Sequence, residues 1–189
     1  MDYNSRRRPG FTLVELVTVM SIVGILSAAG THLMFHFVKN AVYIPNKLNM
    51  DMLVSDALDL MINGDGRAKG LRFSRVITNV QNNQVTFTNQ DSQTIVYRLD
   101  TGTNKLYRSI NGAAEAAVPY YASVAGISMV SKTAGRLFTY YDVNESVTAT
   151  AANVRWITVG LKAMTGSGLY AQWQGQSDQS TSVAVPKFQ

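Results

Sequence analysis

The chain has 189 residues with a net charge of +5 and no cysteine, and 15% of its residues are charged against 46% that are apolar. This length suits one domain of ordinary size plus a long accessory element. The composition excludes an intrinsically disordered chain, and the lack of cysteine excludes disulfides, thiol nucleophiles and cysteine-based metal sites.

The positive charge is concentrated near the N-terminus, where Arg6, Arg7 and Arg8 form the one run of basic residues. A nucleic-acid-binding protein usually carries a clustered basic face. We therefore interpret the charge mainly as a signal of membrane topology, with a basic surface for anionic partners as the alternative.

Residues 11–38 form a long apolar segment whose single formal charge is Glu15. A helix over residues 16–38, rising ~1.5 Å per residue, spans ~35 Å and is long enough to cross the ~30 Å hydrocarbon core of a bilayer. The three arginines precede this segment and Lys39 follows it. By the positive-inside rule the N-terminus stays in the cytoplasm, and we expect the rest of the chain on the outer side of the membrane.

Two simpler interpretations leave part of this segment unexplained. A secretory signal peptide has an apolar region of ~7–15 residues that ends at small residues. Ser27, Ala28 and Ala29 imitate such an end, but the apolar run continues to Val38. A plain membrane anchor accounts for the length but not for Glu15, because a carboxylate within an apolar span is costly and by default marks a functional residue with a positive partner.

The residues around Glu15 carry a specific pattern, which reads Arg-Pro-Gly-Phe-Thr-Leu-Val-Glu-Leu over residues 8–16. This string resembles the prepilin signature of type IV pilins and type II secretion pseudopilins. The resemblance implies a leader peptide at residues 1–10, cleavage by a prepilin peptidase between Gly10 and Phe11, and N-methylation of Phe11, with Glu15 as the fifth residue of the mature chain. Glycine before the cleaved bond leaves no side chain to obstruct a protease cleft.

The resemblance also implies a partner for Glu15. Cleavage frees the amine of Phe11, which is cationic near neutral pH, and in the family this amine pairs with the glutamate of a neighbouring subunit as the helices assemble. Such a pair sets register more than bulk stability, because removing one partner leaves the other unpaired among apolar helices. The alternative is that Glu15 lies in the headgroup zone with water or lipid.

Gly24 and Gly30 are small residues that would let helices approach closely.

No catalytic constellation emerges from the sequence. His32 and His36 share a helix face at spacing i, i+4, but they lie in the apolar segment without a nearby third ligand, so we favour an interfacial role over a metal site. Residues 142–145, Asp-Val-Asn-Glu, supply few of the six or more oxygens that calcium usually needs and are interpreted as a solvated turn. We expect no enzymatic activity, no bound metal and no cofactor.

Residues 39–63 continue in a helical pattern, with apolar side chains at spacing i, i+3, i+4 and i+7. These side chains belong to Val54, Ala57, Leu58 and Met61. The pattern predicts an amphipathic helix that packs on a following domain. Residues 63–66, Asn-Gly-Asp-Gly, indicate the end of that helix, and Pro45 either kinks its join with the membrane segment or begins a new helix.

After residue 70 the sequence changes to short alternating segments rich in β-branched and aromatic residues, separated by clusters of turn residues. They predict an antiparallel sheet packed on the amphipathic helix, and hence an α+β fold with a long N-terminal helix and a β-rich globular domain. Residues 165–182 are interpreted as a surface loop before a last strand at 183–185. The other predicted strands are 85–88, 94–99, 105–108, 137–141 and 155–161.

The order of these segments over residues 85–163 is similar to that of minor pilins and pseudopilins of the J/PilW type. The predicted organisation is a leader at 1–10, a helix at 11–63 and an outward-facing domain at 64–189. Within the helix, residues 11–38 form the transmembrane and filament-core part, and residues 39–63 form the amphipathic part.

The resemblance implies a structural subunit of a bacterial filament, either a type IV pilus or a type II secretion pseudopilus, which starts in the inner membrane. Its implied partners are other pilin or pseudopilin subunits, the prepilin peptidase and methyltransferase, and the ATPase-driven inner-membrane assembly platform; nucleic acid is not expected. A major pilin and a bitopic membrane protein with an outward ligand-binding domain remain the alternatives.

Overall fold

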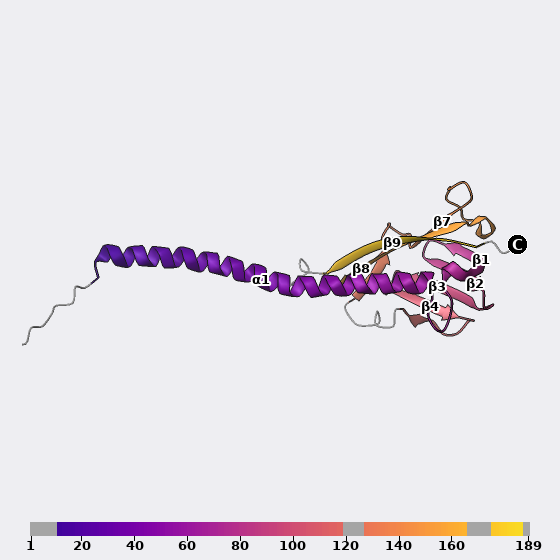
Figure 1. The fold of residues 1–189 in the computed structure, drawn as a ribbon, viewed down its shortest axis with the longest axis horizontal. Coiled ribbons are helices and arrows are strands. Elements are labelled where there is room, and N and C mark those ends of the chain that lie inside the picture. Colours follow the sequence, from indigo (N-terminus) through magenta and orange to yellow (C-terminus); the bar gives the residue numbers. More distant parts are fainter. Residues whose placement is uncertain (1–10, 119–126, 166–174, 187–189) are drawn as a thin grey trace, which may run out of the picture. The chain divides into compact units, whose positions relative to one another are not determined.

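A computed structural model describes residues 11–118, 127–165 and 175–186 of the chain (Figure 1). Its first element is one long helix, α1, at Leu13–Ile62, which contains Pro45. The helix continues through this proline although proline donates no hydrogen bond to the preceding turn, so Pro45 does not begin a new helix. The chain divides into two compact units, Met1–Val42 and Tyr43–Gln189, and α1 contributes to both.

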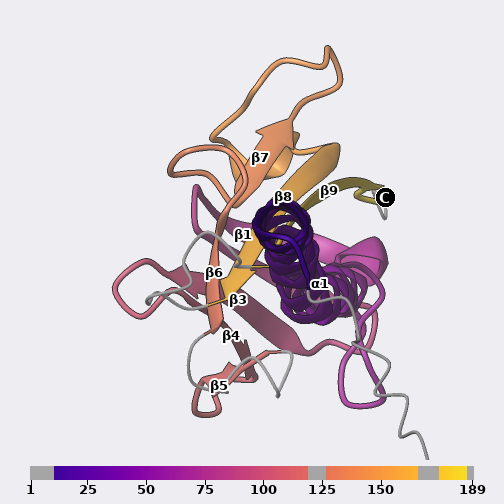
Figure 2. The same cartoon turned by 90° about the vertical axis from the view of Figure 1, so that its left-hand side faces the viewer.

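The second unit contains two antiparallel sheets (Figures 1 and 2). In the first sheet the strands follow one another in chain order: β1 Ser74–Gln81, β2 Gln84–Asn89, β3 Thr94–Asp100, β4 Lys105–Ile110 and β5 Ala116–Ala117. The second sheet consists of β6 Ile127–Ser131, β7 Phe138–Tyr141, β8 Trp156–Thr165 and β9 Gln176–Ala184. Strand β8 pairs with the other three strands of this sheet. In the described ranges the short 3-10 helices η1 Leu71–Phe73 and η3 Ala151–Asn153 lie in the connections.

One hydrophobic core joins α1 and both sheets. The four apolar residues that predicted the amphipathic helix face this core, and Val54, Ala57 and Met61 are fully buried. From the first sheet Phe87 and Tyr97 stack on neighbouring strands with ring centroids 6.2 Å apart. The predicted α+β architecture is therefore confirmed, because the alternating strands and the helix bury their apolar faces against one another.

The β1–β2 turn connects the two sheets. The main-chain carbonyl of Asn82 accepts hydrogen bonds from the N–H groups of Leu137 (2.8 Å) and Phe138 (2.9 Å). The buried hydroxyl of Tyr140 lies 2.9 Å from the carbonyl oxygens of both Gln81 and Gln84. These contacts give hydrogen-bond partners to the N–H groups of the buried Leu137 and Phe138 and to the buried hydroxyl of Tyr140.

The end of α1 is fixed by a compact loop that contains two constrained glycines. Gly64 adopts φ +87°, a left-handed conformation that favours glycine. Gly70 donates its N–H to the carbonyl of Asn63 at 3.1 Å. A Cβ placed on Gly70 would lie 2.6 Å from the carbonyl carbon and oxygen of Ile62. The close approach of these two backbone segments therefore requires glycine at position 70.

The Gly70→Ala variant is expected to be destabilised by about 3 kcal/mol, because backbone atoms rather than a flexible side chain block the added methyl group. Gly66→Ala is the matched control in the same loop, since nothing lies within 4 Å of a Cβ there. We expect this control to stay within about 0.5 kcal/mol of the parent chain. Chemical denaturation would measure both variants, and equal midpoints for them would contradict the prediction.

Five predicted strands are present, but the predicted loop at residues 165–182 is partly strand, and β1, β5 and β6 are additional strands. The interpretation of residues 165–182 as a loop is wrong in part, because β8 extends to Thr165 and β9 starts at Gln176. Strand β9 is rich in Ser, Thr and Gln, and its strand conformation depends on pairing with β8 rather than on its own apolar pattern. Strand β1 was not predicted, and two register shifts interrupt its alternation.

Candidate processing and assembly site

The N-terminus of α1 is closed by a reciprocal pair of side chains, Thr12 and Glu15. The main-chain N–H of Thr12 donates to Glu15 Oε2 at 2.9 Å, and the Thr12 hydroxyl lies 3.1 Å from the same oxygen. In return, the N–H of Glu15 donates to Thr12 Oγ1 at 3.2 Å. This is a capping box, in which the side chains at the N-cap and third helical positions satisfy main-chain donors of the first turn.

The capping box uses only one oxygen of the Glu15 carboxylate. One oxygen, Oε2, accepts both hydrogen bonds from Thr12, and the negative charge lies at the positive end of the helix dipole. Within the described residues, Oε1 has no hydrogen-bond partner. The carboxylate thus keeps one oxygen available for a cationic group from outside the chain's own helix.

Of the residues predicted for processing and topology, the structure describes Phe11 and Lys39. The Phe11 side chain is 86% exposed, and Lys39 is half-buried. Gly10 and the three arginines lie outside the described residues. The geometry of the predicted cleavage site therefore stays a prediction.

Thr12 belongs to the prepilin pattern, but no role was predicted for it from the sequence. The signal was nevertheless present, because Thr-x-x-Glu immediately before a helical apolar run is the sequence signature of a capping box. A role for Thr12 in holding Glu15 could therefore have been predicted from these four residues.

The apolar half of α1, residues 13–38, presents mostly exposed side chains, including Leu13 at 80%, Met20 at 68% and Phe37 at 74%. Hydroxyl groups on this surface are satisfied within the helix, since Thr18, Ser21 and Thr31 each donate to the carbonyl four residues earlier at 2.8 Å. An apolar medium would accept these three hydroxyl groups, because their hydrogen bonds do not depend on water. Among the described elements, α1 alone is long and apolar enough to cross a membrane.

The two helix glycines are not required by the fold of a single chain. A Cβ on Gly24 or Gly30 would meet no other atom within 4 Å. Another molecule could therefore pack closely against α1 at these two glycines, as their small size predicts.

His32 and His36 lie side by side, with Nε2 atoms 3.1 Å apart and ring centroids separated by 4.6 Å. One ring donates a hydrogen bond to the other, as suits an interfacial position with few other polar partners. No group of three or more His, Cys, Asp or Glu side chains that could hold a metal ion occurs in the described ranges.

Residues 142–145 form a turn whose carboxylate is used internally. Asp142 Oδ1 accepts hydrogen bonds from the N–H groups of Asn144 (2.8 Å) and Ser146 (3.0 Å), which is an Asx-type turn. Glu145 has φ 60°, and Val143 is 67% exposed. This arrangement matches the predicted solvated turn.

A helix with an exposed apolar first half, which begins with a capped glutamate and leads into an antiparallel β domain, is the arrangement expected of a protein with one N-terminal membrane anchor. A family model described as the prokaryotic N-terminal methylation motif matches residues 5–31. No curated protein and no solved structure matches the chain.

The family match supports assignment of the chain to the type IV pilins and pseudopilins. It covers residues 5–10, Phe11, Glu15 and the first part of α1. The motif belongs to a structural family, and it implies processing by prepilin peptidase and assembly with other pilins. A single N-terminal apolar helix fits the single-pass inner-membrane anchoring of a pilin.

Proposed function

We propose that this chain is a structural filament subunit, a minor pilin or pseudopilin, which starts as an inner-membrane precursor and is assembled after processing. The observation that carries the proposal is the methylation motif over residues 5–31 on a helix whose one charged residue before Lys39 is Glu15. The exposed apolar surface of α1 supports the same function, because in a filament the neighbouring helices take the place of lipid.

The proposed precursor has its leader in the cytoplasm and its β domain in the periplasm. Arg6, Arg7 and Arg8 precede the span and supply the positive charge that keeps this end inside. Prepilin peptidase cleaves between Gly10 and Phe11, and the new amine of Phe11 is methylated. In both reactions the chain is the substrate, so neither reaction requires a catalytic group from the chain itself.

In assembly, the amine of Phe11 pairs with Glu15 of a neighbouring subunit. The capping box supports this proposal because it leaves Glu15 Oε1 without a partner in the described chain, while Thr12 holds Oε2. A methylated amine still carries its charge and can donate to that oxygen. The pair would set the register between adjacent helices, which apolar contacts alone specify poorly.

Minor-subunit status rests on the resemblance of residues 85–163 to the J/PilW type. A major pilin has the same processing and differs in abundance. Quantitative peptide mass spectrometry of isolated filaments distinguishes the two: a minor subunit is present at a small fraction of the main component, whereas a major subunit dominates the filament.

The chain isolated from native membranes is expected to lack residues 1–10 and to carry one methyl group on Phe11. Intact-mass spectrometry measures both changes in a single experiment. A chain that retains the leader, or that is cut near Ala29, would overturn the proposed pathway. The Gly10→Ala and Gly10→Leu variants provide a graded control, since the larger side chain at the cleaved bond should obstruct the protease more strongly.

A further inference from the structure

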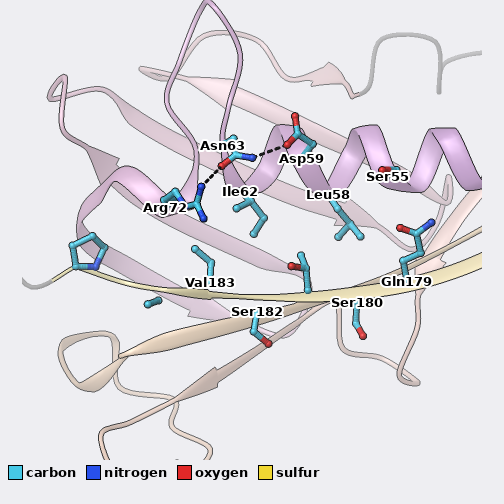
Figure 3. A pocket seen from close by; sticks show the side chains of 13 residues that line it. Ser55, Leu58, Asp59, Ile62, Asn63, Arg72, Gln179, Ser180, Ser182 and Val183 are labelled. Atoms are coloured by element: carbon cyan, nitrogen blue, oxygen red, sulfur yellow. Dashed lines mark hydrogen bonds between the residues drawn. The ribbon is translucent and has the colours of Figure 1, made fainter.

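The groove between the end of α1 and strand β9 has polar side chains that bind one another (Figure 3). Asn63 donates to Asp59 Oδ1 at 2.6 Å, and Arg72 donates to Asn63 Oδ1 at 3.3 Å. Neither of the two histidines of the chain lines this groove. A pair of nitrogen ligands within reach of one outside ion lies instead on the apolar half of α1, at His32 and His36.

The imidazole rings of His32 and His36 bring their Nε2 atoms together. These atoms lie 3.1 Å apart, and both side chains are exposed. Nitrogen ligands bind zinc at about 2.0–2.1 Å, so two of them lie about 3.3 Å apart on a tetrahedral ion and about 2.9 Å apart at right angles on an octahedral one. The observed separation falls between these values. One ion placed beside the line that joins the two atoms would therefore be within bonding distance of both.

The spacing of His32 and His36 in the sequence favoured an interfacial role, because no third ligand is near. The distance between the Nε2 atoms changes this interpretation. A chelate needs only two ligands from the chain when water completes the coordination of the ion. In the part of the chain that the structure describes, no third His, Cys, Asp or Glu joins the pair. The remaining positions on the ion would therefore stay open to water.

The neighbouring side chains leave the two rings available. The Thr31 hydroxyl is used within the helix, since it donates to the carbonyl of Ser27 at 2.8 Å. The Phe35 ring packs edge-on against His36, with centroids 6.4 Å apart. This contact limits the orientations of the imidazole, so less side-chain entropy is lost when the ring binds an ion.

We propose that His32 and His36 together bind a divalent transition-metal ion through their Nε2 atoms. Zn²⁺, Ni²⁺ and Cu²⁺ accept imidazole nitrogen, whereas Mg²⁺ and Ca²⁺ prefer oxygen. Binding requires both Nε2 atoms without a proton. The ring that now donates would move its proton from Nε2 to Nδ1 by exchange with water, and two bonds to the ion would replace the hydrogen bond between the rings. The inference is independent of processing and assembly.

The test is a titration of the full chain in detergent with Zn²⁺, followed by NMR of isotope-labelled histidine rings. The chain has two histidines, so their ring signals report the site directly when the purification tag contains no histidine. Both rings should respond with one common saturation curve that is complete below about 1 mM. The same concentration of Mg²⁺ should leave both signals unchanged.

His32→Ala and His36→Ala each leave one imidazole. Each variant should bind Zn²⁺ at least about tenfold more weakly than the parent chain, because the second contact no longer forms within the same molecule. Met34→Ala is the matched control, since this side chain is 69% exposed and lies between the two histidines in sequence but on another face of the helix. This control should bind as the parent chain does.

Two outcomes would overturn the proposal. The first is the absence of saturation at about 1 mM Zn²⁺. The second is equal affinity of the parent chain and a single-histidine variant, which would mean that each ring binds the ion independently.

Discussion

Glu15→Ala is expected to leave the precursor inserted in the membrane and processed, but to reduce assembled filament by roughly tenfold or more. The change removes the carboxylate that would pair with the amine of Phe11, and that amine then enters the helix bundle without a counter-charge. Comparison of sheared filament fractions with total membrane protein, by immunoblotting, measures the effect. A passive anchor would tolerate or prefer alanine at this position, so wild-type assembly would contradict the proposed function.

Glu15→Gln and Thr12→Val separate the two roles of the carboxylate. Glutamine keeps an oxygen that can accept the N–H of Thr12, so the helix cap is retained while the charge is lost. We expect this variant to assemble as poorly as Glu15→Ala. Thr12→Val removes the hydroxyl that contacts Glu15 Oε2 and accepts the Glu15 N–H but keeps the carboxylate charge, so its assembly defect should be smaller. Equal assembly of Glu15→Gln and the parent chain would show that hydrogen bonding alone is sufficient.

Asp65→Ala is expected to destabilise the β domain by about 2–3 kcal/mol, because it leaves a buried guanidinium without its counter-charge. Arg108 Nη2 lies 2.8 Å from Asp65 Oδ2, and the Arg108 side chain is only 8% exposed. Arg108 Nη1 is buried without a hydrogen-bond partner in the described chain, so this guanidinium depends strongly on Asp65. The same carboxylate accepts the N–H groups of Arg67 and Ala68 and thereby holds the loop that follows α1.

A surface ion pair nearby provides the control. Lys69 Nζ lies 2.9 Å from Asp91 Oδ1, but both side chains are more than 40% exposed. Lys69→Ala should therefore change the free energy of unfolding by less than about 1 kcal/mol. Denaturation curves for the two variants would test the difference, and similar losses would show that burial of Arg108 does not decide the effect.

The Asp65–Arg108 pair also makes stability depend on pH. Burial raises the pKa of Asp65, but the hydrogen bonds from Arg108, Arg67 and Ala68 outweigh it and hold the pKa below its ordinary value. Since the folded pKa is depressed, the stabilisation is fully present above the unfolded value of about 3.9 and is lost as the pH falls through the folded pKa. The parent chain should therefore lose stability more steeply than Asp65→Ala below about pH 4.

The N-terminal part of the protein could be predicted from sequence because its signals are local. The span needs only a run of apolar residues, the processing motif needs consecutive residues around Gly10, and even the capping box follows from the spacing of Thr12 and Glu15. The buried face of the second half of α1 was predictable for the same reason, since Val54 and Met61 recur with the period of the helix.

The tertiary structure decided what depends on residues far apart in the chain. Strand β9 has a polar sequence and is a strand because β8 supplies its hydrogen bonds, and Asp65 and Arg108 meet because the loop after α1 lies against β4. No periodic pattern of residues in the sequence predicts either contact. The sequence by itself determined the long apolar helix and its motif, whereas only folding determined the pairing of β9 with β8 and the buried ion pair, because long-range pairing is set by the packing of the whole domain.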